Sequence, residues 1–338
     1  VAVLAGGIAM TSTNRSVGGT FSTAAGITLN TSTLLLNGTC RIDSGGFFLS
    51  APVYGSASIL VYNPSGVYGR GFEWSALGVG TISTTPGYPN AVQISNNTTL
   101  NYINGAVAAA VGIKAIATHL TIDTGSALHM NFGAVSAGGP MVIGGNLINA
   151  GTLTLGEANG DDFKLAGNLS NTGTFNGNNR AVFFTKTGTQ TIFSSSALTI
   201  PYVVFQPSVG NTLVQLLSSL TVSAPLGGNA ISFSATLDSF DINGNSLIIG
   251  TPGVTNTIFG TGTFRGSTTS NLTLLGTGSI GILKFNTTTP FSNLATLTIN
   301  RTSGNIAAVL GSTLTINTAL VLSNGILDVG NNILAIGA

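Results

Sequence analysis

The chain has 338 residues, of which only 10 are Lys or Arg, 9 are Asp or Glu and one is Cys. The net charge of +1, carried by scattered basic residues, argues against nucleic-acid binding, and the single Cys excludes a disulfide framework. Hydrophobic residues make up 43% of the chain, too many for a disordered protein, yet no apolar run approaches the roughly 20 residues of a membrane helix. Ser, Thr, Asn and Gly supply most of the polarity and form helices poorly, so the composition predicts an all-β protein.

Residues 1–140 have the least regular pattern and are interpreted as an N-terminal β region with an aromatic loop at 61–90. Aromatic rings can stack on sugars while presenting a polar edge, so one hypothesis is a glycan or partner contact. The other is a local cluster that plugs or caps the stack of coils. The residues concerned are Tyr62, Tyr68, Phe72, Trp74 and Tyr88.

Residues 141–250 are predicted to be solenoid repeats. Residues 145–152 and 167–174 share a Gly-Asn-Leu pattern, and the distance between the two copies is the expected length of one coil. Between these copies lies an acidic turn that contains Glu157, Asp161 and Asp162. Asn, Gly and Asp are typical of solvated turns, whereas three carboxylates with nearby carbonyls also suit Ca²⁺. A calcium site therefore stays open beside the plain corner, and no other cofactor is expected.

Residues 251–338 continue the repeats, and 278–338 are interpreted as a copy of a module at 190–250. The clearest matching pair is 241–250 with 328–337, where Asp241 and Asp328 hold equivalent positions that favour a structural corner. The pattern stops in the middle of a repeat. We therefore expect a piece of a longer secreted protein, truncated at both ends, whose uncapped strand edges associate end to end.

A recurring Leu-Thr-apolar triplet indicates strands with one buried face, because side chains alternate along a strand. The spacings of the repeats predict a right-handed parallel β-solenoid (β-helix) of stacked coils, each roughly 17–22 residues long. A β-sandwich array explains the coil-length repeat less well. The positions predicted to be buried are Leu120, Ile122, Leu153, Leu155, Leu198, Ile200, Leu297, Ile299, Leu314 and Ile316, and those predicted to point outward are Thr121, Thr154, Thr199, Thr298 and Thr315.

Over residues 55–338 the chain resembles the β-strand repeat regions of very large secreted proteins of Bacteroidota, many of them type 9 secretion cargo and some gliding or surface adhesins. The segments that carry the resemblance are 60–63 with 71–74, 87–90 with 97–100, 120–126, 165–169, 180–184 and 188–192. The resemblance implies a secreted scaffold. It also implies the export route, although the sorting domain of that family is not among these residues.

The sequence favours a non-enzymatic structural or adhesive segment, a stiff β-helical stalk at the cell surface or in an extracellular fibre. The expected partners are neighbouring repeats of the same or identical chains, and surface glycans, with no nucleic acid and no membrane span. The alternative is a carbohydrate-binding or carbohydrate-active β-helix protein. Such an enzyme needs a paired acid and base on one face, whereas the only tight cluster of acids here is the turn at 157–162.

Overall fold

The computed structural model describes residues 2–3, 8–10, 15–29, 34–102, 112–130, 137–302 and 306–337. The chain divides into two compact units, Val1–Arg180 and Ala181–Ala338. In the described ranges the regular elements are β-strands, most of them short, and one 3₁₀ helix, η1 (Phe72–Trp74). None of the described helical residues belongs to a helix long and apolar enough to cross a membrane. The prediction of an all-β protein is confirmed.

The first unit contains five groups of paired strands, named here sheets I to V. Sheet I consists of β1 (Ala2–Val3), β4 (Phe21–Thr23), β7 (Thr39–Ile42), β10 (Ile59–Tyr62), β12 (Ala91–Ile94), β15 (Leu120–Ile122), β18 (Leu147–Asn149) and β21 (Leu169–Asn171). Sheet II consists of β11 (Gly66–Gly69), β13 (Thr98–Asn101), β16 (Ala127–His129), β19 (Thr152–Thr154) and β22 (Thr174–Asn176). Sheet III consists of β14 (Lys114–Ile116), β17 (Met141–Ile143) and β20 (Phe163–Leu165); sheet IV of β2 (Ile8–Met10), β5 (Gly26–Leu29) and β8 (Phe47–Phe48); and sheet V of β3 (Arg15–Val17), β6 (Leu34–Leu36) and β9 (Val53–Tyr54).

The second unit contains four groups, named sheets VI to IX. Sheet VI consists of β25 (Leu198–Ile200), β28 (Leu220–Val222), β31 (Ser246–Ile249), β34 (Asn271–Thr277), β36 (Asn293–Thr302), β38 (Leu314–Asn324) and β40 (Leu334–Ile336). Sheet VII consists of β23 (Ala181–Phe184), β26 (Tyr202–Phe205), β29 (Gly228–Ser232) and β32 (Asn256–Phe259). Sheet VIII consists of β24 (Gly188–Ser194), β27 (Thr212–Leu216), β30 (Ser239–Asp241) and β33 (Thr263–Arg265), and sheet IX of β35 (Ile282–Leu283), β37 (Ile306–Leu310) and β39 (Ile326–Asp328).

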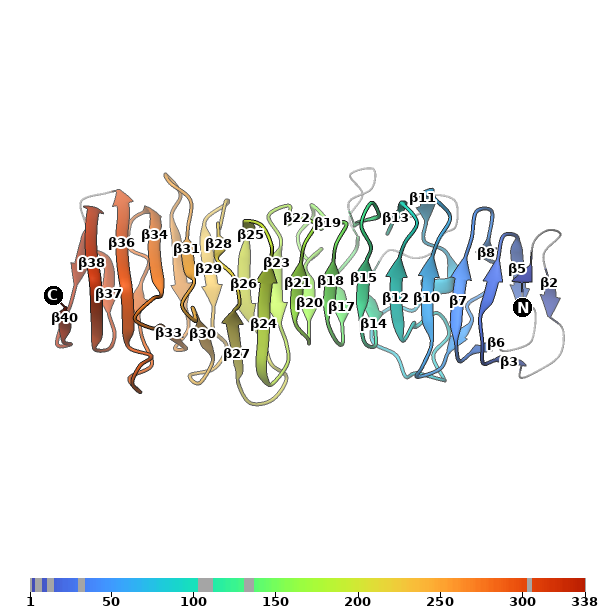
Figure 1. Ribbon diagram of the computed structural model, residues 1–338, viewed down its shortest axis with the longest axis horizontal. Coiled ribbons are helices and arrows are strands. Elements are labelled where there is room, and N and C mark those ends of the chain that lie inside the picture. The colour runs from blue at the N-terminus through green and yellow to red at the C-terminus, as the bar shows by residue number, and fades with distance from the viewer. Residues whose placement is uncertain are drawn as a thin grey trace. The chain divides into compact units, whose positions relative to one another are not determined.

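Successive coils of each unit stack through parallel strands (Figure 1). Every pairing between named strands inside a unit, over the residues that the structure describes, is parallel. An antiparallel bridge joins Val53 to Pro86, outside that stacking. The predicted parallel β-solenoid is therefore confirmed.

Coil length varies more than the sequence predicts. The echo between 145–152 and 167–174 is one coil, because Leu147 pairs with Leu169 in register. The coil that leads from Phe21 to its register partner Cys40 is shorter. The coil that leads from Ile59 to its register partner Ala91 is much longer, and it is called here the long coil. In the long coil the extra residues lie between strands, and Ile59–Tyr62 still pair in register with Ala91–Ile94. Coil length is therefore not confined to the predicted range.

One of the spacings used for the prediction does not correspond to a coil. The Leu-Thr-Ile triplets that begin at Leu297 and Leu314 lie close together in the sequence, but they are not stacked on one another. Leu297 pairs with Leu320, and Leu314 pairs with Leu334. The recurrence of a triplet therefore identifies strands correctly without identifying which strands pair.

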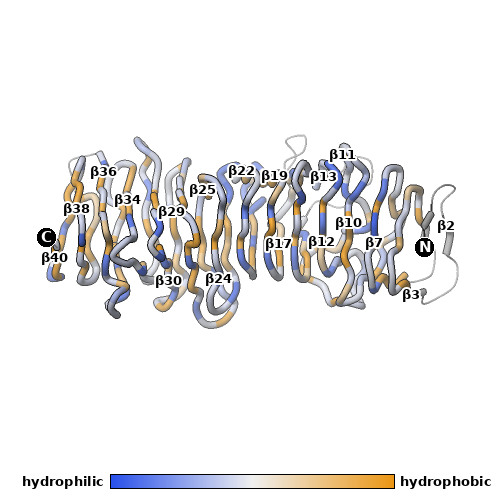
Figure 2. Tube along the Cα trace, viewed as in Figure 1, coloured by the Kyte–Doolittle hydropathy of each residue, from blue (hydrophilic) through white to orange (hydrophobic). Residues whose placement is uncertain are grey.

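The core consists of apolar side chains on the inward positions of the strands, and hydrophobic positions recur along the strands of both units (Figure 2). All ten apolar positions predicted to be buried are at most 3% exposed. Four of the five Thr residues between them are half-buried, and the fifth, Thr199, is exposed. The alternation of the Leu-Thr-apolar triplets thus predicts the inner and outer faces correctly.

Asp241 and Asp328 make the same local turn. Each carboxylate accepts a hydrogen bond from the backbone N–H two residues later, at 2.9 Å from Asn243 and 2.9 Å from Gly330. An Asp side chain that bonds its own backbone in this way fixes a turn between two strands. The expected corner role of these two acids is confirmed.

Candidate functional site

Two places in the described structure concentrate chemistry. The first is a buried polar cluster in the first unit, called here the Glu73 cluster. The second is a hollow on sheet VI of the second unit. The Glu73 cluster consists of Tyr54, Tyr62, Arg70, Glu73, Trp74 and Tyr102, all at most 1% exposed.

Glu73 lies in η1, among the extra residues of the long coil. Its Oε1 atom accepts hydrogen bonds from the Gly71 N–H at 2.7 Å and the Tyr62 hydroxyl at 3.0 Å. Its Oε2 atom is buried without a hydrogen-bond partner among the described residues. Burial raises the pKa of Glu73, and these hydrogen bonds together with the charge of Arg70 oppose that rise only in part. The carboxyl group therefore binds its proton more tightly than an exposed Glu does.

Gly71 is required by the close approach of this carboxylate. A Cβ atom at residue 71 would lie 2.7 Å from Glu73 Oε2, closer than van der Waals contact permits. The Gly-Phe-Glu-Trp sequence therefore builds a turn in which the backbone N–H of Gly71 faces the side chain two residues later.

Arg70 holds the other side of the cluster. Its Nε donates to the Tyr102 carbonyl at 2.8 Å and its Nη1 to the Trp74 carbonyl, while its guanidinium lies 5.2 Å from the centre of the Tyr102 ring. Burial lowers the pKa of Arg70. Nearby, burial and the charge of Arg70 lower the pKa of Lys114 to about 8. The Arg70 cation is thus held inside the first unit by carbonyl groups and an aromatic ring.

The aromatic side chains join coils to one another. The Trp74 indole N–H donates to the Ala115 carbonyl at 3.0 Å, and its ring meets the Tyr102 ring edge to face at 6.1 Å. The Tyr54 hydroxyl donates to the Glu73 carbonyl at 2.8 Å. The Tyr62 and Tyr68 rings lie 5.5 Å apart. The cluster thus fills the long coil and fixes it to its neighbours.

This geometry limits the glycan hypothesis for the aromatic loop. Tyr62 and Trp74 are fully buried and Tyr88 is 5% exposed, so their ring faces are not accessible to a sugar. Tyr68 and Phe72 are half-buried. Only these two of the five predicted contact residues keep surface that a ligand could touch. Packing inside the coil is the interpretation that burial supports.

The acidic turn is also used structurally. Asp161 is fully buried, and its carboxylate accepts hydrogen bonds from the backbone N–H groups of Ala137 at 2.9 Å and Gly138 at 3.1 Å. Among the described residues, no group of three or more His, Cys, Asp or Glu side chains is arranged to hold a metal ion. Because Asp161 faces this backbone segment, the structure does not bring it together with Glu157 and Asp162 around a cation.

Several buried ionisable residues were not predicted from the sequence. Arg301 is 1% exposed and donates to four carbonyl groups and one amide, those of Gly278, Leu275, Thr277 and Asn256. Burial lowers the pKa of Arg301 to about 10. Such residues anchor turns of one coil to backbone groups of another. The scarcity of charged residues is the signal that could have identified them. Because the chain has so few charged residues, each one is a candidate for a specific structural role.

Asp238 follows the same rule in the second unit. It is fully buried, and its carboxylate accepts hydrogen bonds from the backbone N–H groups of Thr212, Ser234 and Ala235 at 2.8–2.9 Å. Charge-assisted hydrogen bonds of this kind are among the stronger ones in proteins. Like Asp161, Asp238 is an acid that fixes loops of neighbouring coils.

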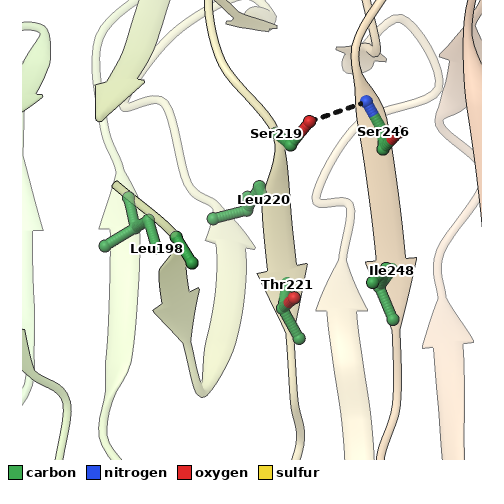
Figure 3. Close-up of a pocket in the computed structure, with 7 residues that line it drawn as sticks. Leu198, Ser219, Leu220, Thr221, Ser246 and Ile248 are labelled. Atoms are coloured by element: carbon green, nitrogen blue, oxygen red, sulfur yellow. Dashed lines mark hydrogen bonds between the residues drawn. The ribbon is translucent and has the colours of Figure 1, made fainter. Parts of the chain in front are cut away.

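The hollow on sheet VI has a different character, because it opens to solvent and contains no ionisable side chain. Its volume is about 180 Å³. At one edge the Ser246 N–H donates to the Ser219 hydroxyl at 3.2 Å, and Thr221 and Ile248 lie on the neighbouring strands β28 and β31 (Figure 3). The lining residues are Ala197, Leu198, Ser219, Leu220, Thr221, Ser246 and Ile248.

Comparison with protein-family models, with curated proteins and with solved structures found no match. A function for this chain is therefore inferred from its fold and from the chemistry of its residues.

Proposed function

We propose that the chain is a structural, adhesive segment of a secreted cell-surface or extracellular fibre protein and acts as a stiff β-helical stalk. The observation that carries this proposal is the in-register stacking of coils inside each unit, where each ladder is extended by the next coil. Repeat proteins of this kind are stabilised by contacts between neighbouring repeats, so they resist deformation along the direction of stacking.

Side-chain hydrogen bonds between adjacent coils support the proposal. The Asn149 amide donates to Asn171 Oδ1 at 2.7 Å inside the first unit. Gln93 donates to Asp123 at 2.7 Å, and Gln215 to Asp241 at 3.1 Å, by the same Gln-to-Asp arrangement in different units. These bonds add a second set of connections beside the backbone ladders and stiffen the coil stack.

The composition supports a location outside the cell. Charged residues make up only 6% of the chain, and its one Cys is buried and forms no disulfide. The resemblance to secreted repeat proteins of Bacteroidota agrees with this location and with export by type 9 secretion. A chain of this kind depends on neither a disulfide nor a large surface charge for its fold.

Location and stiffness are tested separately. An antibody raised against the chain should label intact cells of the source organism, and protease treatment of those cells should remove the label. Atomic force microscopy of the purified chain should show extended particles that lengthen when the segment is duplicated in tandem. Antigen confined to the cytosolic fraction, or compact particles from the tandem protein, would contradict the proposal.

The carbohydrate-active alternative is tested by turnover. We expect no release of reducing ends when the chain is incubated with a panel of polysaccharides. Release that disappears on an Asp-to-Asn substitution would establish an enzyme in place of a stalk.

A further inference from the structure

We propose that the last coil of the second unit is a docking surface for the first coil of a second copy of the chain, so that copies join end to end. The last coil consists of residues 319–324 of β38, of β39 and of β40. The inference rests on the proposed stalk and names its partner, because the joint continues the parallel ladders of one copy into the next.

Three strand edges of the last coil have no partner strand among the described residues. Residues 319–324 pair with β36, β39 pairs with β37, and β40 pairs with the first three residues of β38. β39 ends sheet IX and β40 ends sheet VI (Figure 1). An unpaired edge presents a row of N–H and C=O groups that can pair with a further strand. The backbone of this coil can therefore accept another coil at three places.

The inward side chains of the last coil are core residues that are not covered. Leu322 is the register partner of Ile299, and Ile336 is the register partner of Ile316. Ile299 and Ile316 are fully buried, whereas Leu322 is 48% exposed and Ile336 is 58% exposed. Each pair holds the same position in consecutive coils, so an inward side chain here needs a coil on both sides to be buried. Removing such apolar surface from water favours association.

The last coil lacks the features that protect a free edge from pairing. Natural sheets blunt their edges with Lys, Pro or inward-pointing charges, and repeat arrays end on a polar face. Residues 314–338 contain one charged residue, Asp328, and no Lys or Pro. Asp328 is the register partner of Val309, an outward position between two buried residues, and it bonds to the Gly330 N–H. The inner face of this coil is therefore uncharged.

The first unit supplies a coil of matching layout. Its first coil has three strands, β1, β2 and β3, and each pairs in parallel with the next coil. Each of these strands begins its sheet, so its other edge has no partner strand among the described residues. The first coil of one copy can thus extend the ladders that end at the last coil of another. Such a head-to-tail contact uses two different surfaces and builds an open filament.

One charged residue opposes this contact. Arg15 on β3 is the register partner of the buried Leu34, so it holds an inward position of the first coil. On β2 the corresponding residue is apolar, since Ile8 is the register partner of the fully buried Ile27. Burying a cation without a partner costs free energy. Copies should therefore join reversibly and more weakly than coils of one chain do.

The first test is the mass of the full chain as a function of concentration. Sedimentation equilibrium from about 1 µM to about 100 µM covers the affinities of reversible contacts. We expect the average mass to rise beyond that of a dimer, and electron microscopy to show filaments that lengthen with concentration. A monomer at every concentration, or a mass that levels off at two copies, would overturn the proposal.

Matched variants place the contact on the inward side of the last coil. Leu322→Glu puts a charge at an inward position and should weaken association about tenfold or more, whereas Val321→Glu, 40% exposed on the outward side of the same strand, should not. Ile336→Glu should likewise weaken association, and Ala335→Glu should not. All four side chains are already exposed, so the fold should be retained, which circular dichroism checks. Equal weakening by each variant and its control would overturn the proposal.

Mixing two blocked variants tests the direction of the contact. Leu322→Glu blocks the last coil and Ile8→Glu blocks the first, so each variant alone should stay monomeric. An equal mixture should form dimers and stop there, because it holds one intact surface of each kind. This expectation holds even if a charge loosens the coil that carries it, since the other coil forms the contact. Dimers of either variant alone would mean that two like ends meet, and a mixture without dimers would mean that the ends do not fit; either result would overturn the proposal.

These outcomes are separate from those of the stalk. A chain that stays monomeric would lose the end-to-end joint, while antibody labelling and the particle length of the tandem protein would still decide the stalk. Filaments formed by a chain whose antigen is confined to the cytosolic fraction would support the joint and contradict the stalk.

Discussion

Two regions of the first unit fill their coils in different ways. Between 147 and 176 two successive coils, called here the short coil because each lacks the extra residues of the long coil, resemble each other closely. Leu147 stacks on Leu169, and the Asn149 amide donates to Asn171. Between 59 and 94 the long coil contains extra residues, which include η1 with the buried Glu73 and Trp74.

The comparison shows how a solenoid tolerates irregularity. Between 147 and 176 two inward positions place identical residues on one another, Leu147 on Leu169 and Asn149 on Asn171, so each of these residues packs against its own kind in the next coil. In the long coil, one set of unlike residues must satisfy one another, and a single change leaves a buried polar group without its partner. We therefore expect the long coil to be the more sensitive to substitution.

The largest effect is expected at Trp74. Trp74→Ala should destabilise the chain by about 3–5 kcal/mol, because it removes a fully buried ring and leaves the Ala115 carbonyl unpaired. Val67→Ala, at a position 73% exposed on β11, is the control and should have little effect. Denaturant unfolding followed by circular dichroism measures both. Equal midpoints would show that the cluster does not stabilise the coil.

The next effect is expected at a corner of the short coil. A Cβ at residue 173 would lie 2.0 Å from the Gly151 carbonyl oxygen, so Gly173→Ala should push the coils apart. We expect a loss of about 1–3 kcal/mol, as for other overpacked sites. Gly18→Ala, where a Cβ meets nothing within 4 Å, should be nearly neutral. A Gly173→Ala chain as stable as Gly18→Ala would mean that the corners are not close-packed.

The stability of the folded chain should depend on pH through the long coil, because this coil contains the buried Glu73. The pKa of Glu73 is higher in the folded chain than its ordinary value of 4.5, so the folded chain binds this proton more tightly than the unfolded chain. The stability gained from protonation is fully present below pH 4.5 and is lost as pH rises through the folded pKa. Glu73→Gln should flatten that dependence, whereas Val67→Ala should keep it. Unfolding midpoints that fall equally with rising pH in wild type and Glu73→Gln would exclude Glu73 as the cause.

The smallest effect is expected at the surface. Arg41 and Asp43 form an ion pair at 3.0 Å with side chains 44% and 24% exposed. Exposed pairs contribute about 0–1 kcal/mol, so Arg41→Gln should change stability by less than about 0.5 kcal/mol. Thermal unfolding checks this value. A loss comparable with that of Trp74→Ala would show that surface charge, and not the buried cluster, stabilises this part of the chain.

Alternation and repetition in the sequence were enough to predict the strand faces and the parallel stacking. Alternation in triplets such as Leu120-Thr-Ile122 defines which side chains are buried, because successive residues of a strand point to opposite faces. The echo between 145–152 and 167–174 defines one coil, because stacked coils place identical residues beside each other.

The coil lengths and the environment of the charged residues depend on tertiary structure alone. A loop can grow without changing the ladders on either side, so spacing along the chain does not reveal which strands pair. The burial of Arg70, Glu73 and Arg301 likewise depends on carbonyl groups and rings that lie up to 45 residues away. The hollow on sheet VI has the same origin, since its lining comes from strands that become neighbours only when the coils stack.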